Sequence, residues 1–381
     1  MRPTAAGVAI GLAVGYNIAN VGPAAQVVSD AYGVRLGLVG LLTTALFVTH
    51  LVMQIPGGRL VDRRGALVWA AVALAIIAAG NVVALTTASF EVGIIARLIA
   101  GLGTGVGFVA GSDYVRALVG SATAQGLFGA AGVGGGGIAL AVVPLTTGVF
   151  DWRAPYATAL IAACAVLALL WLAPRDRRER AAVRRDTPPI KDVVGDRRLY
   201  PLAVAHTASF AFSVIVGNWT VSLLEHDGYG RRLGGAVAAL TLLGGFVTRP
   251  LGGRAFQRAP VRAAPLLAAS MVAGAAGTVL LLLDIPLAAR IVGAAVLGLA
   301  AGIPFAAAFS GAQAIRSDVP GAAIGFINSC ATLVIAVGAP LVGFTFSLAG
   351  NGRTGFAAVA VLWALSSVAV LPSRLPRAAT A

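Results

Sequence analysis

The sequence predicts an all-α membrane protein with twelve transmembrane helices, arranged as two pseudo-symmetric six-helix bundles. Its composition, the spacing of its apolar stretches and an internal repeat predict this class. Of the 381 residues, 58% are hydrophobic and 11% are charged, whereas a soluble domain averages roughly 45–50% and about 25%. So few charged side chains do not cover the surface of a soluble protein of this size. Soluble enzymes, disordered chains and disulfide-linked secreted domains are therefore excluded.

Apolar stretches long enough to cross a bilayer, about 20 residues each, occur on both sides of one charged segment. Residues 173–199 contain nine basic and five acidic residues and a Pro188-Pro189 pair, which favours a solvated cytoplasmic linker. We therefore predict an N-terminal bundle (residues 1–172), this linker (173–199) and a C-terminal bundle (200–381). The twelve stretches begin near Ala5, Gly37, Ala66, Val92, Ser121 and Arg153, then near Tyr200, Leu233, Val261, Pro286, Gly321 and Thr354.

The distribution of basic residues predicts the orientation of the chain in the membrane. The formal net charge is +14, but the arginines lie in short loops, so they indicate topology rather than nucleic-acid binding. With both termini in the cytoplasm, 20 of the 28 basic residues fall on the cytoplasmic side and five on the other. The first stretch is interpreted as a transmembrane helix rather than a signal peptide, because further spans follow it. We expect a multi-pass protein of the plasma (inner) membrane and, by default, a monomer.

Motifs for enzymatic chemistry or bound cofactors are not found in the sequence. The chain contains no phosphate-binding P-loop, zinc-protease motif or nucleophile elbow. Cys164 and Cys330 both lie in apolar stretches, which disfavours a disulfide or a metal site. We therefore expect no enzyme activity, no cofactor and no metal.

The two halves of the sequence repeat with an offset of about 195 residues. Weak internal symmetry of this kind is found in membrane proteins built from structural repeats. The matching pairs are Gly58 and Gly253 at an offset of 195, Arg97 and Arg290 at 193, and Gly129 with Gly325 and Pro144 with Pro340 at 196.

The loop between the second and third spans contains the most specific motif. Gly58, Asp62, Arg63 and Gly65 follow the pattern G-x-x-x-D-R-x-G. This motif, together with the layout of six spans, a linker and six spans, resembles the major facilitator superfamily. The resemblance covers nearly the whole chain. The resemblance implies that these four residues form a conformational latch between the bundles, in which the Asp62 carboxylate is stabilised at a helix N-terminus. The alternative is an ordinary loop that sets the topology.

The family motif continues with two basic residues, but this chain has Ala66 and Leu67 at those positions. A second family motif, an arginine early in the fourth span followed by spaced glycines, is matched by Arg97 and the glycines from Gly101 to Gly107.

Polar residues within the apolar spans are the candidate substrate contacts, because such residues are costly in a bilayer and usually face the bundle interior. In the family that the chain resembles, the first, fourth, seventh and tenth spans line a central path. The alternative role is a hydrogen bond between neighbouring helices. The candidates are Asn17, Asn20, Arg97, Ser213, Asn218 and Trp219.

Arg249 lies about two-thirds of the way through the eighth span, and its repeat mate is Gln54 at an offset of 195. The segment from Arg249 to Gly253 is similar to the nitrate/nitrite porter branch, which places one arginine in each half to hold its anion. This chain has Gln54 in place of the second arginine, so the resemblance to that branch is partial. It implies that Arg249 and Gln54 contact an anion from opposite sides. The alternative is that Arg249 caps helix ends or reaches lipid phosphate.

The acidic residues within or next to the spans all lie near span ends. Proton-coupled exporters of cationic drugs commonly place a carboxylate at mid-membrane, so this distribution disfavours that class. His50 and His206 are candidates for proton coupling, because histidine titrates near neutral pH.

We expect a secondary transporter that moves a small anion or polar metabolite across the lipid bilayer by alternating access, with coupling to protons or another ion left open. Two alternatives remain. One is efflux of hydrophobic drug-like compounds, and the other is a membrane receptor or scaffold without transport, which has no need of the Asp62 latch.

Overall fold

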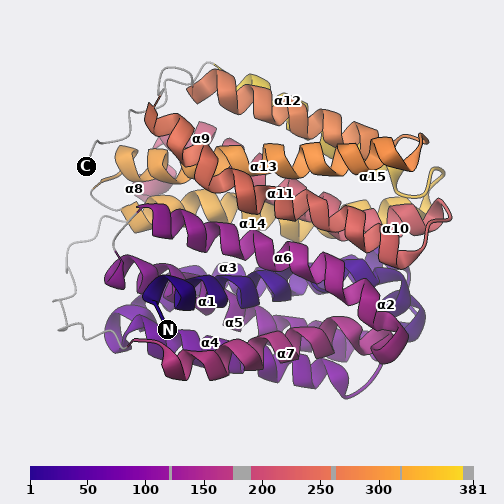
Figure 1. Ribbon diagram of the computed structural model, residues 1–381, viewed down its shortest axis with the longest axis horizontal. Helices are drawn as coiled ribbons and strands as arrows, with labels where there is room; N and C mark the ends of the chain where they lie inside the picture. The colour runs from indigo at the N-terminus through magenta and orange to yellow at the C-terminus, as the bar shows by residue number, and fades with distance from the viewer. Residues whose placement is uncertain (120–121, 175–189, 259–262, 318–319, 372–381) are drawn as a thin grey trace.

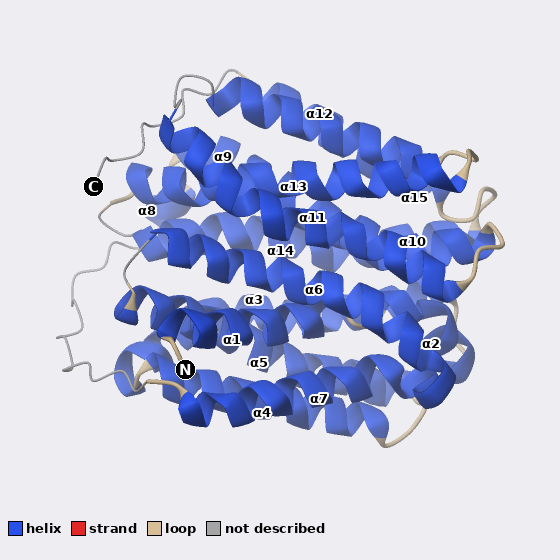
Figure 2. Ribbon diagram, viewed as in Figure 1, coloured by secondary structure: helices blue, strands red, loops and turns tan. Residues whose placement is uncertain are grey.

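The computed structural model describes residues 1–119, 122–174, 190–258, 263–317 and 320–371, and this part of the chain consists of helices and connecting loops without a strand (Figure 2). Among the described residues, eleven helical stretches are long and apolar enough to cross a membrane, and one of them, the 47-residue stretch Gly126–Leu172, is long enough for two spans. The stretches therefore correspond to twelve spans, and the predicted all-α membrane class is confirmed.

The first six spans contain seven α-helices and three short 3-10 turns. The first span is broken by the turn η1 and continues into α2, and the other five spans each contain one α-helix. Their bounds are α1 Pro3–Ala19, η1 Gly22–Ala24, α2 Ala25–Tyr32, α3 Leu36–Arg64, α4 Ala66–Leu85, α5 Phe90–Leu118, α6 Ala122–Phe150, η2 Asp151–Arg153, α7 Ala154–Leu169 and η3 Leu170–Leu172.

The last six spans follow a short helix and a 3-10 turn. The seventh span consists of α9, a π-helical segment η5 and α10, which run on without a break. The bounds are α8 Ile190–Val194, η4 Arg197–Leu199, α9 Tyr200–His206, η5 Thr207–Phe212, α10 Ser213–His226, α11 Arg231–Arg258, α12 Ala263–Leu282, α13 Leu287–Ile315, α14 Pro320–Phe344, η7 Thr345–Ser347 and α15 Arg353–Val370.

Local sequence explains where several helices begin and end. Ser89 caps α5, because its hydroxyl accepts a hydrogen bond from the Val92 amide at 3.3 Å. Helix α2 ends at Gly33 with φ of 64°, and α3 ends at Gly65 with φ of 90°. These positive φ values favour glycine because it has no Cβ.

The helices run side by side along the long axis of the molecule, with the first six spans in one half and the last six in the other (Figure 1). Two seams join the halves, because α6 packs against α11 and α3 packs against α14. We name the end where the N-terminus and α8 lie the linker end, on the left in Figure 1, and the opposite end the far end.

Glycines allow helices to approach closely within each half. A Cβ atom on Gly15 of α1 would lie 1.7 Å from the Gly132 carbonyl oxygen of α6. A Cβ atom on Gly298 of α13 would lie 2.0 Å from the Leu240 carbonyl oxygen of α11. Any larger residue at these positions would push the helices apart, so small residues determine this packing.

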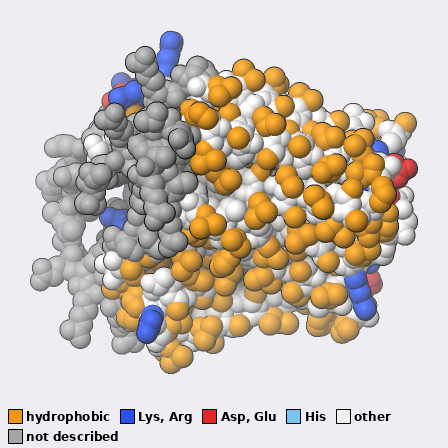
Figure 3. Space-filling model, turned by 45° about the horizontal axis from the view of Figure 1, so that its top comes forward, with side chains coloured by type: hydrophobic (Ala, Val, Ile, Leu, Met, Phe, Trp, Pro, Cys, Tyr) orange, Lys and Arg blue, Asp and Glu red, His pale blue; other side chains and the backbone are white. Residues whose placement is uncertain are grey.

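The outer surface is apolar across the middle of the molecule. Figure 3 shows hydrophobic side chains over most of the visible face, with charged side chains towards its two ends. Large apolar side chains such as Val149, Trp171 and Val368 are 81%, 85% and 65% exposed. A surface of this kind is stable in lipid rather than in water. The chain is therefore a multi-pass integral membrane protein.

At the linker end, a charged pair holds the start of the seventh span. The Asp196 carboxylate accepts a hydrogen bond from the Arg198 amide at 3.1 Å and also binds the Arg198 guanidinium. These hydrogen bonds hold the pKa of Asp196 below its usual value. The pair caps η4 where the chain enters the second half.

Candidate functional site

Arg97 lies in the second turn of α5 and is 1% exposed. Its Nη1 donates to the Asn20 side-chain oxygen at 3.1 Å, and its Nη2 donates to the Asn17 backbone oxygen at 2.9 Å. A longer bond of 3.4 Å runs from its Nε to the Leu42 carbonyl of α3. The guanidinium therefore joins the first, second and fourth spans through neutral acceptors.

The amides around Arg97 are also occupied. Asn17 accepts from Asn81 of α4 at 2.8 Å and donates to the Ala13 carbonyl. Asn20 donates to the Pro155 carbonyl of α7 at 2.8 Å. The structure thus brings the predicted residues Asn17, Asn20 and Arg97 together, but in contact with one another and with the helix backbone.

His50 of α3 is buried and bonded on both ring nitrogens. Thr104 of α5 donates its hydroxyl proton to the Gly101 carbonyl, so its oxygen accepts the bond of 3.0 Å from His50 Nδ1. The other ring nitrogen, Nε2, then accepts from the Gln54 side-chain amide at 2.9 Å. This network holds a neutral imidazole with its proton on Nδ1. It also turns Gln54 towards His50.

His206 lies immediately before the π-helical segment Thr207–Phe212 and has a less complete set of partners. Its Nε2 donates to the Asn328 side-chain oxygen at 3.2 Å, while its buried Nδ1 has no hydrogen-bond partner. The rings of Phe210, Phe305 and Phe309 surround the imidazole, with ring centroids 4.9 to 5.8 Å away. π-Helical turns are rare and occur often at functional sites.

Arg249 of α11 lies at the seam between the halves and is 4% exposed. Its Nη1 donates to the Gly129 carbonyl of α6 at 2.5 Å, and its guanidinium stacks 3.9 Å from the centre of the Phe305 ring. Its Nε is buried without a partner. The guanidinium thus retains unused donor capacity in the interior and is hardly exposed on the outer surface of the protein.

A narrow void, too small in this conformation to hold a water molecule, lies beside Arg249. Its walls come from α6, η5, α10, α11 and α13, so both halves contribute. It combines one guanidinium and three hydroxyl groups with apolar side chains. The lining residues are Val133, Ser209, Ser213, Thr241, Leu242, Gly245, Arg249 and Ala301.

Two other predicted residues lie further along α10. Asn218 is 3% exposed, and neither its side-chain nitrogen nor its side-chain oxygen has a partner. Trp219 donates its indole N–H to the Ala339 carbonyl of α14 at 2.8 Å. Asn218 therefore has free hydrogen-bonding capacity in the interior, whereas the polar atom of Trp219 is used between helices.

The structure brings the predicted residues into three groups. Ser213 and Arg249 share the void, Arg97 joins Asn17 and Asn20, and Gln54 joins His50 instead of lining the void. Phe305 and the Gly129 carbonyl were not predicted. An aromatic residue and a helix carbonyl give no sequence signal that separates them from ordinary packing.

The predicted latch falls largely outside what the structure describes. The side chains of Asp62 and Arg63 and the surroundings of Gly58 lie outside the described residues. Gly65 is described, and its positive φ places it at the sharp turn between α3 and α4.

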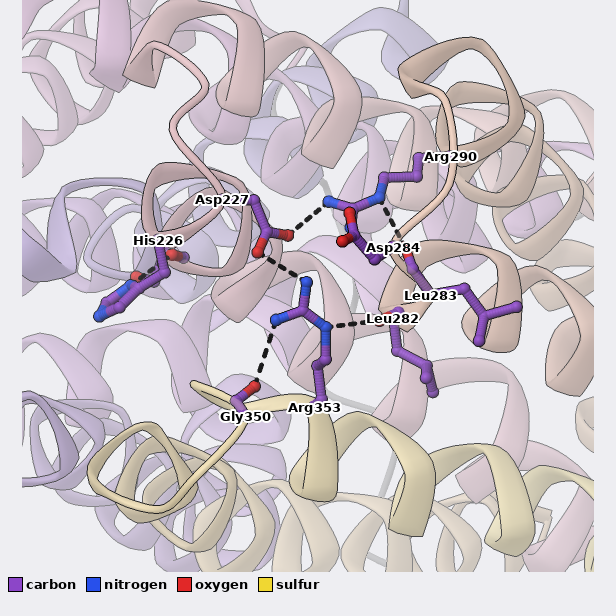
Figure 4. A network of polar contacts seen from close by, with 9 residues as sticks. His226, Asp227, Leu282, Leu283, Asp284, Arg290, Gly350 and Arg353 are labelled. Carbon is purple, nitrogen blue, oxygen red and sulfur yellow. Dashed lines mark hydrogen bonds and ion pairs between the residues drawn. The ribbon is translucent and has the colours of Figure 1, made fainter.

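The repeat mate of Arg97 has a different environment at the far end. Arg290 of α13 is 1% exposed and donates to the Asp227 carboxylate at 2.5 Å and to the Leu283 carbonyl at 2.8 Å. The same carboxylate binds Arg353 at 2.7 Å, and Arg353 also donates to the Leu282 carbonyl (Figure 4). This network ties together three loops of the second half.

Twelve apolar spans in two halves, with buried polar groups and a void at the seam, define a polytopic helical membrane protein of the transporter class. The family model of the Major Facilitator Superfamily matches residues 8–339. The chain therefore belongs to the major facilitator superfamily, as its motifs predicted. Its members are secondary transporters of small solutes and not enzymes, so this protein is a secondary transporter that sits in a lipid bilayer. A search among curated proteins finds no significant match.

Proposed function

We propose that this transporter moves a small anion or polar metabolite by alternating access, with Arg249 as its principal contact. The observation that carries the proposal is the guanidinium at the seam, which is buried and has an unpartnered Nε next to a void lined by hydroxyl groups. Arginine within a span costs about 2.5–3.5 kcal/mol on the insertion scale. A substrate role accounts for that cost, because the guanidinium fork matches carboxylate and other planar oxyanions.

We assign further substrate contacts to the candidates that keep free hydrogen-bond donors or acceptors. Ser213 lines the void, and Asn218 has both a free donor and a free acceptor. Asn17, Asn20 and Arg97 bind one another, so we propose that they hold the first half rigid and touch the substrate only through rearrangement. Once the halves separate, Trp219 supplies apolar surface along the path and Gln54 supplies polar surface.

Efflux of hydrophobic compounds is the second candidate, and one observation favours it. Phe210, Phe305 and Phe309 form an aromatic wall around His206, close to Arg249. Aromatic side chains of this kind bind apolar and flat compounds. The two candidates differ in whether Arg249 contacts the substrate.

We propose His206 as the principal site of proton coupling, with His50 as the second. The Nδ1 atom of His206 is free to accept a proton, and Phe305 contacts both His206 and Arg249. A proton on His206 would add a second positive charge near Arg249, which an anion would neutralise. Proton and anion would then bind together. His50 is already bonded on both nitrogens, so its protonation requires Gln54 to turn its amide over.

We further propose a monomer in the plasma membrane with both termini in the cytoplasm. The excess of arginines in loops at the linker end supports this orientation. Reporter fusions at each terminus and in the loop between α2 and α3 would test it.

Uptake by proteoliposomes tests the proposed function. Purified protein would be assayed with a panel of small inorganic and organic anions and a panel of hydrophobic compounds, with and without a pH gradient. We expect anion uptake that Arg249→Lys reduces at least tenfold, since lysine lacks the fork, while expression stays within about twofold. Arg35→Lys, at an exposed position at the far end, is the matched control. Transport of hydrophobic compounds with normal activity in Arg249→Lys would favour the second candidate.

A further inference from the structure

The three hydroxyl groups that line the void beside Arg249 all use their protons within the protein. Ser213 and Thr241 donate to backbone carbonyls of their own spans, at 2.8 Å and 2.6 Å. Ser209 donates to the Ala301 carbonyl of α13. A hydroxyl group has one proton and two lone pairs. These side chains therefore have only their acceptor capacity left to offer a solute.

Arg249 supplies the opposite kind of group to the same void. Its Nε is a charged donor that is buried without a partner, and the residue is 4% exposed. Among the described residues, the lining includes no acidic side chain. The site thus combines one positive donor with three neutral acceptors. A solute that matches it carries a single negative charge and at least one hydrogen-bond donor of its own.

This pattern distinguishes between simple anions and anions that carry a donor. Nitrate and acetate contain only acceptors, so they would bind a hydroxyl group here only if it turned away from its carbonyl. Such a turn exchanges one hydrogen bond for another and gains little. A solute that donates to the hydroxyl oxygen adds a bond and breaks none. The site therefore favours a solute with a donor next to its anionic group.

The charges around the void favour a neutral donor over an ammonium group. An ammonium group would lie near the Arg249 guanidinium, and the solute has only one carboxylate to balance both positive charges. A buried charge without a counter-ion is strongly unfavourable. A hydroxyl group donates without adding charge. The aliphatic lining residues Val133, Leu242 and Ala301 suit a short hydrocarbon chain beside these polar groups.

The acceptor pattern does not depend on the void being closed. Val133 of α6 is the lining residue from the first half, and the other lining residues belong to the second half. The bond from Ser209 joins the seventh span to α13, so it lies entirely within the second half. When the halves separate in alternating access, α6 moves away from α11 and the void widens. The hydroxyl bonds within the second half stay in place and face the solute unchanged.

We propose that the solute is a short hydroxy-monocarboxylate. Its carboxylate binds the Arg249 guanidinium, and its hydroxyl group donates to the oxygens of Ser209, Ser213 and Thr241. This inference rests on the proposed function, because it takes Arg249 as the contact for the anion. It adds the requirement for a neutral donor, which selects among the small anions.

Three compounds with the same carbon skeleton test the requirement. Propionate, lactate and alanine carry a hydrogen atom, a hydroxyl group and an ammonium group, respectively, at the carbon next to the carboxylate. Their affinities would be measured by calorimetry on the purified protein and by competition for uptake into proteoliposomes. We expect lactate to bind about tenfold more tightly than propionate, because its hydroxyl group pairs with buried acceptors. Alanine should bind more weakly than lactate.

Variants of the hydroxyl groups locate the effect. Thr241→Val and Ser213→Ala should each reduce the preference for lactate over propionate about threefold and leave propionate affinity unchanged, since each removes one acceptor. Thr248→Val is the matched control. The Thr248 hydroxyl also lies on α11 and donates to a helix carbonyl, that of Gly244 at 3.1 Å, but it does not line the void. The preference compares two compounds on one preparation, so it is independent of the amount of folded protein.

Equal affinities for lactate and propionate would overturn the inference, and so would tighter binding of alanine than of lactate. A preference unchanged in both Thr241→Val and Ser213→Ala would overturn it as well. A reduced preference in either variant, with Thr248→Val unchanged, supports it. Arg249→Lys separates this inference from the proposed function. If lactate and propionate bind equally and both weaken in Arg249→Lys, the anion contact stands and the donor requirement falls. If no anion binds, both fall.

Discussion

The buried polar groups of the two halves differ in how completely they are paired. In the first half, Arg97, Asn17, Asn20 and Asn81 satisfy one another, and the described buried atoms without partners are only the Tyr16 hydroxyl and the Trp69 indole nitrogen. In the second half, unpaired buried atoms lie on several helices. They belong to His206, Asn218, Ser222, Arg249, Arg290, Thr332 and Trp363.

This difference indicates that the two halves of the repeat have different roles. Buried polar groups are normally hydrogen-bonded, and those that are not require a reason such as a ligand or a catalytic role. When the buried polar groups bond to one another, they stabilise one arrangement of the helices. When they lack partners, a bound solute that supplies hydrogen bonds stabilises the protein further. We therefore expect the second half to make most of the solute contacts, and the first half to act as a rigid frame against which it moves.

The two mated arginines differ in another respect, the charge of their partners. Arg97 binds neutral oxygens only, whereas Arg290 binds the Asp227 carboxylate, which Arg353 shares.

Removing the Asp227 carboxylate should have the largest effect on stability. Asp227→Ala leaves the buried Arg290 charge without its counter-ion, and we expect a loss of about 3–5 kcal/mol. A thermal-shift assay in detergent would detect it. Asp284→Ala is the matched control, because Asp284 is 95% exposed and lies 3.8 Å from Arg290. Equal melting temperatures of Asp227→Ala and the wild type would contradict the prediction.

Replacing Arg97 should cost less, because no buried charge is left without a counter-ion. Arg97→Met leaves the Asn20 side-chain oxygen and the Asn17 and Leu42 carbonyls without this donor, and we expect a loss of about 3 kcal/mol. Melting curves of Arg97→Met and Asp227→Ala, measured side by side, rank the two networks. A smaller loss in Asp227→Ala would reverse the comparison between the halves.

A matched pair of asparagine variants compares the halves directly. Asn20→Leu removes two hydrogen bonds and should destabilise the protein by about 1–3 kcal/mol. Asn218→Leu removes none, so stability should hold or rise while solute affinity falls. Thermal shift together with uptake at varied solute concentration separates the effects. If Asn218→Leu is the less stable of the two, Asn218 has a structural role.

The latch should have the smallest effect on folding and still affect transport. Asp62→Asn keeps the size of the side chain, so we expect normal membrane insertion with strongly slowed uptake. The motif match and the stabilisation of a carboxylate at a helix N-terminus motivate this expectation. Gln257→Asn, at the uncharged repeat position, is the control and should transport normally. Normal uptake by well-expressed Asp62→Asn protein would refute the latch.

The fold was predictable because a transmembrane span is recognised from the average hydropathy of about 20 residues. A single polar residue changes that average little. The composition and the Asp62 motif predicted both the class and the family. The predicted pairing of Pro144 with Pro340 agrees with the structure, since Gly235 packs on Pro144 as Gly40 packs on Pro340.

The partners of the polar residues were less predictable, because they depend on how each helix is rotated about its axis. The pattern selected Ser213 and Arg249 without showing that they share a void. It placed Gln54 opposite Arg249, whereas the structure bonds it to His50. The π-helical segment Thr207–Phe212 contains no glycine or proline that would predict it.

That π-helical segment changes the register of the seventh span. A π-helical turn accommodates extra chain in one turn, so side chains after it point in directions offset by about 100° for each added residue from those of a continuous α-helix. Cysteine scanning from Tyr200 to His226 should therefore give two accessibility waves whose phases do not join. An alignment that assumes one unbroken period would assign Ser213 and Asn218 to the wrong face of the helix.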